Sequence, residues 1–521
     1  MKYINVCLCL LFVQWGICVN AQNKGDGQDW PAECKKVEIV SSADHTPQYA
    51  YFFRAKSDKP RPLVVRLHAW SSDYAKVDNE AQLCIDNDYS YIHPDFRGGN
   101  DHPEACGSPL VIQDINDAID YAIAHANVDT TSIHIIGGSG GGYATLLCYM
   151  KLKRPIKTFT AWASITNLVD YYYECVGRRE KYGKYAHDLE KVTSGLPRAG
   201  FVPYFNEAEA IKRSPVFMNT PVNLRKNSKL FIFAGIHDGG LSGDVPFIHS
   251  LKMFNKIVSD FDYSEQNILF STEEMLRLMD WQTTKSPIFK DHLSILIQRQ
   301  YLDKVQINLF EGGHEMISNR VLDGVNSQNI FIISDSNGVS HNGWVERLKR
   351  KRFSDFIYSV PVPGDIFSCS RLGKDGDLLY QVESHVNNAE HRMNKVDKVL
   401  IMLGTADYKS ICTGKQKTTL QNIKSLLERI KSHPVYQMCH PDIFIMTPPP
   451  SVVDASSGKN FVARVGLSAP LEKIVEEEGC HFVNTDARSW SLWKASASDC
   501  IGLDLYGQSV ANIVNDAIGS K

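Results

Sequence analysis

The first half of the chain alternates short apolar runs with longer amphipathic ones. Residues 63–68 and 89–93 are short, mostly apolar stretches, which we interpret as buried strands. Between these runs and residues 132–136, Ile112, Ile115 and Ile119 recur at helical spacing and predict a helix. Further strands are expected at residues 132–136, 230–234 and 305–310. Strands that alternate with helices predict a mostly parallel sheet with its ligand site at the carboxyl ends of the strands.

A second alternating block begins near residue 329. It contains three expected strands and two expected helices, at residues 330–333, 399–403 and 443–446 and at residues 418–432 and 471–478. A chain of 521 residues is too long for one ordinary core. We therefore predict two closely packed α/β domains, residues 22–325 and 329–521, joined by a short polar stretch.

Two long insertions interrupt the first block, between residues 171 and 219 and between residues 240 and 304. Both are rich in aromatic and charged residues. Insertions of this kind form caps over a ligand site or elaborate the surface, and the sequence leaves both interpretations open.

The amino terminus has the pattern of a secretory signal peptide. Lys2 precedes an apolar run at residues 6–19, and the small residue Ala21 ends a cleavage-site pattern. The run is short for a membrane span, so we expect cleavage after residue 21, a secreted or periplasmic protein, and no stable membrane insertion.

Composition excludes several classes of partner and site. A net charge of −3 gives no electrostatic case for binding nucleic acid. The 13 cysteines, three of which lie in the leader, show no CxxC pattern. We expect no metal site and no cofactor.

A Gly-x-Ser-x-Gly motif follows the expected strand at residues 132–136. It spans residues 137–141 and is followed by a helix-compatible stretch, the strand–turn–helix context of a nucleophile elbow. The motif therefore predicts that Ser139 is a nucleophile.

A serine nucleophile needs a base and an acid that orients the base. Asp238 follows the expected strand 230–234, and His314 follows the strand 305–310, so the order Ser, Asp, His is the order expected after such an elbow. Asp244 is an alternative for the acid, and His237 is interpreted as a neighbour rather than the base. The backbone amides of Gly140 and Trp70 are the expected oxyanion donors, with Ala69 as the alternative to Trp70.

Residues 37–318 resemble an α/β-hydrolase of the prolyl-oligopeptidase type. The similarity rests on residues 68–70, 95–98 and 114–121, together with the elbow, Asp238 and the Gly-His pair at 313–314. His68-Ala69-Trp70 stands where the family has His-Gly-Gly, which leaves the second oxyanion donor open.

Residues 329–521 resemble the SGNH (GDSL-like) hydrolases, whose fold is a flavodoxin-like sandwich. Ser336, Gly364 and Asp499 match three of the family's motifs. Ala406 and Gly502 stand where the family has its oxyanion asparagine and its base histidine, so the resemblance implies an inactive, vestigial second site.

These features predict an exported serine hydrolase whose substrate class is open. An esterase that deacylates a complex carbohydrate is the leading interpretation, because the second domain resembles carbohydrate-deacylating folds. The alternative is a serine exopeptidase of the prolyl-oligopeptidase type, whose substrate would be a peptide. Such peptidases usually carry a β-propeller, and the roughly forty residues between the expected cleavage site and the first strand are too few for one.

Overall fold

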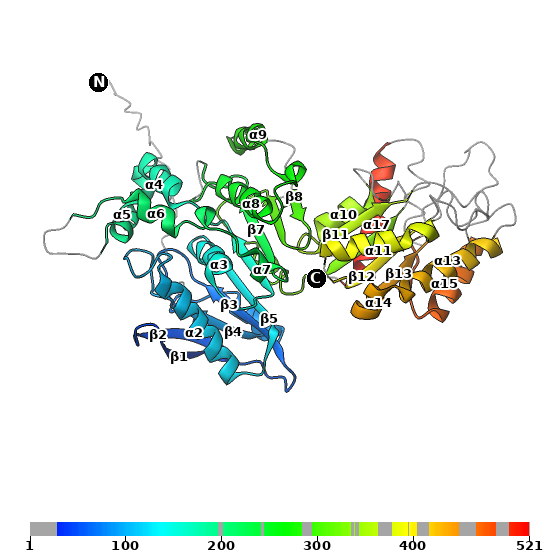
Figure 1. The fold of residues 1–521 in the computed structure, drawn as a ribbon, viewed down its shortest axis with the longest axis horizontal. Helices are drawn as coiled ribbons and strands as arrows, with labels where there is room; N and C mark the ends of the chain where they lie inside the picture. Colours follow the sequence, from blue (N-terminus) through cyan, green and yellow to red (C-terminus); the bar gives the residue numbers. More distant parts are fainter. Residues whose placement is uncertain are drawn as a thin grey trace, which may run out of the picture.

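The computed structural model describes residues 29–195, 202–240, 244–283, 294–334, 338, 343–362, 378–393, 395–403, 416–447, 465–485 and 500–519. The expected signal peptide, residues 1–21, lies outside this part of the chain. The described residues form two sheets with their own helices, placed side by side (Figure 1).

The first sheet has nine strands in the order β1-β2-β4-β3-β5-β6-β7-β9-β8. Its strands are β1 (Lys35–Val40), β2 (Pro47–Phe53), β3 (Arg61–Leu67), β4 (Ser90–Pro94), β5 (Val128–Gly138), β6 (Thr158–Trp162), β7 (Lys229–Gly235), β8 (Ile295–Tyr301) and β9 (Val305–Phe310). The six adjacent strands β4, β3, β5, β6, β7 and β9 are parallel to one another. The antiparallel pairs lie at the two edges of the sheet. This confirms the expected α/β-hydrolase fold with a mostly parallel sheet.

Strand β6 was not expected from the sequence. It is fully buried between β5 and β7, but its sequence TFTAW alternates threonine with apolar residues and so lacks a continuous apolar run. Thr158 Oγ1 lies 2.6 Å from Nδ1 of the buried His134 on β5. Thr158 is thus paired inside the sheet rather than directed to solvent, and Thr160 is buried as well.

Helices cover both faces of this sheet. Helices α2 (Pro109–His125), α3 (Gly140–Lys151) and α8 (Ile248–Phe261) share the largest apolar cluster with one face, and α1 (Ala81–Asp86) packs on the other. This unit also contains α7 (Val222–Arg225), α9 (Thr272–Thr283) and the 3₁₀ turns Pro215–Phe217, Gln266–Ile268 and Ser318–Arg320.

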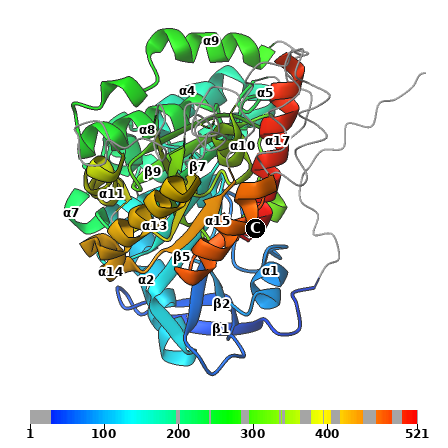
Figure 2. The ribbon, with the colours of Figure 1, turned by 90° about the vertical axis from the view of Figure 1, so that its right-hand side faces the viewer.

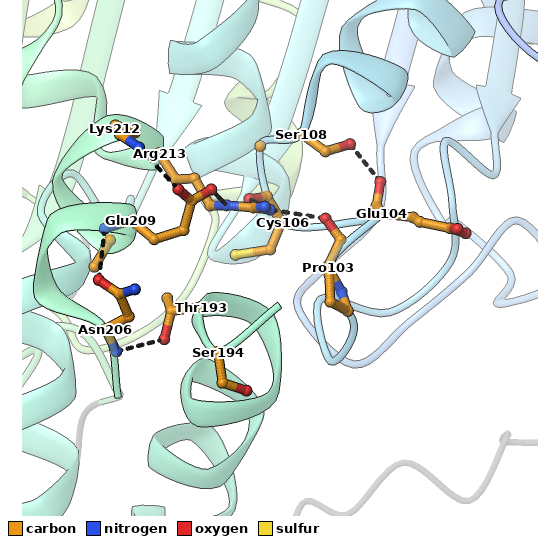
Figure 3. A network of polar contacts seen from close by, with 12 residues as sticks. Pro103, Glu104, Cys106, Ser108, Thr193, Ser194, Asn206, Glu209, Lys212 and Arg213 are labelled. Carbon is orange, nitrogen blue, oxygen red and sulfur yellow. Dashed lines mark hydrogen bonds and ion pairs between the residues drawn. The ribbon is translucent and has the colours of Figure 1, made fainter. Parts of the chain in front are cut away.

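The first insertion forms a cap of three helices, α4 (Leu168–Gly177), α5 (Arg179–Thr193) and α6 (Glu207–Arg213). Figure 3 shows the contacts of Arg213, the last residue of α6, with the loop that precedes α2. Its guanidinium donates to the carbonyls of Pro103, Ala105 and Cys106 at 2.9, 3.1 and 3.2 Å and pairs with Glu209. These contacts hold the cap against the body of the sheet unit.

The second sheet has five parallel strands in the order β11-β10-β12-β13-β14. They are β10 (Asn329–Ser334), β11 (Phe356–Pro361), β12 (Lys398–Met402), β13 (Asp442–Met446) and β14 (His481–Val483). In chain order this is 2-1-3-4-5, the flavodoxin-like arrangement. One face carries α10 (Trp344–Lys351) and α17 (Cys500–Ala517), and the other carries α11 (Leu378–Met393), α13 (Gln416–Ser432), α14 (Pro434–Cys439) and α15 (Val465–Glu477) (Figure 2).

The junction between the two sheets is packed. Val321, Leu322 and Val325 are buried in the same apolar cluster as Phe233 on β7 and Phe353 beyond α10. The rings of Phe233 and Phe353 lie 5.6 Å apart between centroids. The stretch that the sequence presents as a polar boundary is therefore part of an apolar interface.

Candidate active site

Ser139 occupies a strained turn between β5 and α3. Its φ is 57° and its ψ is −121°, a left-handed backbone conformation that is unusual for a residue other than glycine. The turn closes because glycines flank the serine: a Cβ on Gly137 would lie 2.1 Å from the carbonyl oxygen of Gly141. The conformation is that of a nucleophile elbow.

Asp238 and His314 form a hydrogen-bonded pair. Nδ1 of His314 lies 2.8 Å from Oδ2 of Asp238, directly beyond the carboxyl ends of β9 and β7. The other oxygen, Oδ1, accepts from the backbone N–H of Val245 at 3.0 Å, and Asp238 is fully buried. Because both oxygens accept hydrogen bonds, the carboxylate is fixed in orientation and Nδ1 carries a proton.

The environment of His314 favours its charged form. Burial alone would lower its pKa, but the hydrogen bond and the charge of Asp238, together with the charge of Asp244, raise the pKa above 6.5. Nε2 of His314 lies 3.9 Å from Oδ2 of Asp244. Asp238 and Asp244 therefore face opposite nitrogens of one ring, and Asp238, rather than Asp244, contacts Nδ1.

The loop that carries His314 abuts the serine turn. Met316 packs so closely against Gly138 that a Cβ on this glycine would lie 2.5 Å from the methionine sulfur. Among the described residues no hydrogen bond joins Ser139 Oγ to His314, a contact that is often long in enzymes before substrate binds. The three candidate residues thus lie on adjoining loops at the carboxyl ends of β5, β7 and β9.

The two expected oxyanion donors are neighbours. A Cβ on Gly140 would lie 2.3 Å from the backbone nitrogen of Trp70, so the loop after β3 passes directly beside the elbow. Across the described ranges, neither amide donates to a backbone carbonyl. Both therefore remain able to donate to an oxyanion, and this closeness explains why only glycine fits at position 140.

The cap rests on the loop that carries Trp70. The indole Nε1 of Trp70 donates to Asp188 Oδ2 on α5 at 3.3 Å, and Lys184 on the same helix lies 3.0 Å from Asp188 and 2.9 Å from Ser71 Oγ. Tyr171 and Tyr182 are buried in the same cluster as Trp70. The first insertion is therefore a cap beside the site, which decides between the two interpretations that the sequence left open.

His237 has a role in the fold that the sequence did not indicate. Its ring nitrogens lie 3.1 Å from the carbonyl oxygen of Gln282 and 2.5 Å from Oε1 of Glu311. Glu311 follows β9 and Gln282 lies near the end of α9, so these partners are far apart in sequence. No local pattern could have revealed them.

The residues of the expected second site lie outside the described part of the chain. This holds for Ser336, Gly364 and Asp499. Within the described residues no group of His, Cys, Asp or Glu side chains is arranged to hold a metal ion, and no helix there is long and apolar enough to cross a membrane.

Part of the chain is similar to a known protein family. Residues 75–273 match the prolyl oligopeptidase family. Dipeptidyl aminopeptidase BIII from Pseudoxanthomonas mexicana is 31% identical over 100 residues, which cover 18% of this chain and 14% of that protein. The chain thus spans a small part of the curated relative that it matches.

Solved structures of several peptidases also align with the chain. An acylaminoacyl peptidase from Pyrococcus horikoshii aligns with 54% of this chain and 37% of its own, at 18% identity and a TM-score of 0.36. Oligopeptidase B from Leishmania major aligns with 55% of this chain and 34% of its own, at 12% identity and a TM-score of 0.35.

The family match contains two of the three candidate residues. Ser139 and Asp238 lie within residues 75–273, whereas Trp70 and His314 lie outside them. The nine-stranded part of the chain therefore contains the segment that matches the prolyl oligopeptidase family.

Proposed function

We propose that this protein is a serine peptidase that works through a triad of Ser139, His314 and Asp238. The observation that carries the proposal is the 2.8 Å contact between His314 Nδ1 and Asp238 Oδ2 beside the strained turn of Ser139. A buried carboxylate that fixes the tautomer of a histidine is the arrangement that activates a serine hydroxyl.

In the proposed reaction, Ser139 Oγ attacks the carbonyl carbon of the substrate while His314 Nε2 takes the hydroxyl proton. Asp238 keeps Nδ1–H oriented and stabilises the imidazolium that forms. The amides of Gly140 and Trp70 donate to the oxyanion of the tetrahedral intermediate. His314 then gives the proton to the leaving amine, and water hydrolyses the acyl-enzyme by the same steps.

Peptide substrates have more support than acylated carbohydrates. The family match covers Ser139 and Asp238, and the curated relative is named as an aminopeptidase. The esterase interpretation rested on the fold of the second unit, and the residues that would show its chemistry lie outside the described part of the chain. Tyr171 and Tyr182 are buried and pack the cap, whereas Tyr173 and Tyr204 are exposed, so the aromatic side chains of the cap do not favour sugar over peptide substrates.

We also propose that the second unit is an inactive SGNH-like domain. The flavodoxin-like strand order supports this, and so do Ala406 and Gly502 in the places of the asparagine and the histidine. Export remains part of the proposal, and a mature amino terminus at Gln22, read by protein sequencing from the exported fraction, would support it.

The test is a substrate panel on purified mature protein with Ser139→Ala as the control. Peptide nitroanilides with free and with blocked amino termini are compared with short-chain nitrophenyl esters and with acetylated and feruloylated glycans. We expect amide hydrolysis that Ser139→Ala abolishes. Release of acyl groups from glycans without any peptide hydrolysis would overturn the peptidase proposal in favour of the esterase.

A further inference from the structure

The loop that carries Asp238 and the loop that carries His314 are joined at several points. The backbone amides of Ile236 and His237 donate to the carbonyls of Phe310 and Gly312, both at 2.9 Å. A Cβ on Gly235 would lie 2.3 Å from the carbonyl oxygen of Gly313. The relative position of the proposed acid and base therefore depends on this junction.

His237 contributes the side-chain link in the junction. Nδ1 lies 3.1 Å from the carbonyl oxygen of Gln282, and a carbonyl oxygen can only accept, so Nδ1 carries a proton. Nε2 lies 2.5 Å from Oε1 of Glu311, so one further proton is shared between this nitrogen and the carboxyl group.

Gln282 connects the same loop to α9. Its side-chain amide donates to the carbonyl oxygen of Asp238 at 2.6 Å, and its side chain lies against Gly240. His237, which is next to the proposed catalytic acid, thus contacts the segment that follows β9 on one side and the end of α9 on the other. His237 is 28% exposed at its side chain and Glu311 is 15% exposed, so the pair is partly shielded from solvent.

We propose that His237 is a positioning residue: through its contacts with Glu311 and the Gln282 carbonyl, it holds the Asp238 loop in register with the His314 loop. This inference rests on the proposed function, because its catalytic consequence requires the triad.

If the loop that carries Asp238 moves, the orientation of His314 changes, although His237 itself does not contact the substrate. Misplacement of a catalytic group by about 1 Å can cost on the order of 100-fold in rate. Loss of the His237 link should therefore lower kcat and leave KM nearly unchanged.

The variants separate the two contacts of the ring. In His237→Asn the amide nitrogen lies where Nδ1 was and reaches only Gln282, whereas in His237→Gln it lies where Nε2 was and reaches only Glu311. Glu311→Ala removes the partner, and Glu311→Gln keeps a hydrogen bond to a neutral ring. His481→Gln, in an exposed His–Asp pair of the second sheet 4.0 Å apart, is the matched control.

The first readout is the rate at which a fluorophosphonate labels Ser139 in the full chain. We expect both His237 variants and Glu311→Ala to react at least about tenfold more slowly than wild type, with Glu311→Gln in between. His481→Gln should react like wild type. Labelling of the His237 variants within twofold of wild type would overturn the inference while leaving the proposed function intact. Absence of Ser139 labelling in wild type would overturn both.

The second readout needs neither activity nor a variant that folds. In wild-type protein with ¹⁵N-labelled histidine, we expect Nδ1 of His237, which faces the Gln282 carbonyl oxygen, to carry a proton. A His237 ring without a proton on Nδ1 would overturn the inference.

Discussion

Asp244 Oδ2 lies 3.9 Å from His314 Nε2, the nitrogen opposite the one that contacts Asp238. In the proposed mechanism this nitrogen must be unprotonated in the resting enzyme to accept the proton of Ser139. A carboxylate at this position favours the protonated ring, and so opposes the first step at low pH.

The pH dependence follows with a definite sign. The pKa of His314 lies above 6.5, so activity should fall as the pH drops through a value higher than that of a free histidine. Asp244→Asn removes one of the two flanking charges and should move this acid limb of kcat/KM to lower pH, with more activity at pH 6. Full pH profiles of wild type and variant measure the shift, and coincident acid limbs would contradict the role of Asp244.

Asp238→Asn should act differently from Asp244→Asn. The amide would donate where the carboxylate accepts, so His314 would present the wrong tautomer to Ser139, and kcat should fall by about 10³–10⁴-fold. Steady-state kinetics at the pH optimum test this. If Asp244→Asn instead caused the larger loss of kcat, Asp244 would be the acid of the triad.

Substitutions of Ser139 and Ser336 should have different effects on activity. Ser139→Ala should abolish both labelling and substrate turnover, since it removes the nucleophile. Ser336→Ala should leave turnover unchanged, because in the proposed SGNH-like domain Gly502 takes the place of the base histidine. Loss of turnover in Ser336→Ala, measured on the same substrate, would show that the second unit is active.

The sequence allowed the main elements of the site to be predicted because each follows a buried strand. The expected strand at 305–310 coincides with β9, and those before Ser139 and Asp238 fall within β5 and β7. The apolar runs identify these strands, and the order of motifs identifies the candidate residues. What such reasoning missed depends on contacts between distant segments, such as the approach of Asp244 to Nε2 of His314 and the link from His237 to Glu311. The strand β6 was missed because its two threonines, which are buried in the sheet, interrupt the apolar run.

The anchor of the cap can be tested by stability. Arg213 donates to three carbonyls of another segment, and hydrogen bonds from a charged group contribute about 1.5–3 kcal/mol each. All three contacts start from Nη1, which has only two protons, so their contributions do not add. Arg213→Ala should lower the free energy of unfolding by about 2–3 kcal/mol, read from denaturant titration. Lys212→Ala removes an exposed ion pair to the same Glu209 and should change it by less than about 1 kcal/mol. Equal effects of the two substitutions would show that Arg213 does not anchor α6.

The oxyanion site offers the sharpest steric test. Alanine at position 140 would place its Cβ 2.3 Å from the nitrogen of Trp70 and 2.5 Å from its Cα, so the loop after β3 must move. Because this loop carries the second proposed donor, Gly140→Ala should lower kcat by about 10²–10³-fold, the loss expected for one oxyanion donor. Gly177→Ala is the matched control, since a Cβ at the end of α4 meets nothing within 4 Å. Both variants are compared by kcat and by thermal unfolding. A Gly140→Ala variant that keeps wild-type kcat would show that the amide of Trp70 takes no part in the reaction, and Ala69 would become the candidate for the second donor.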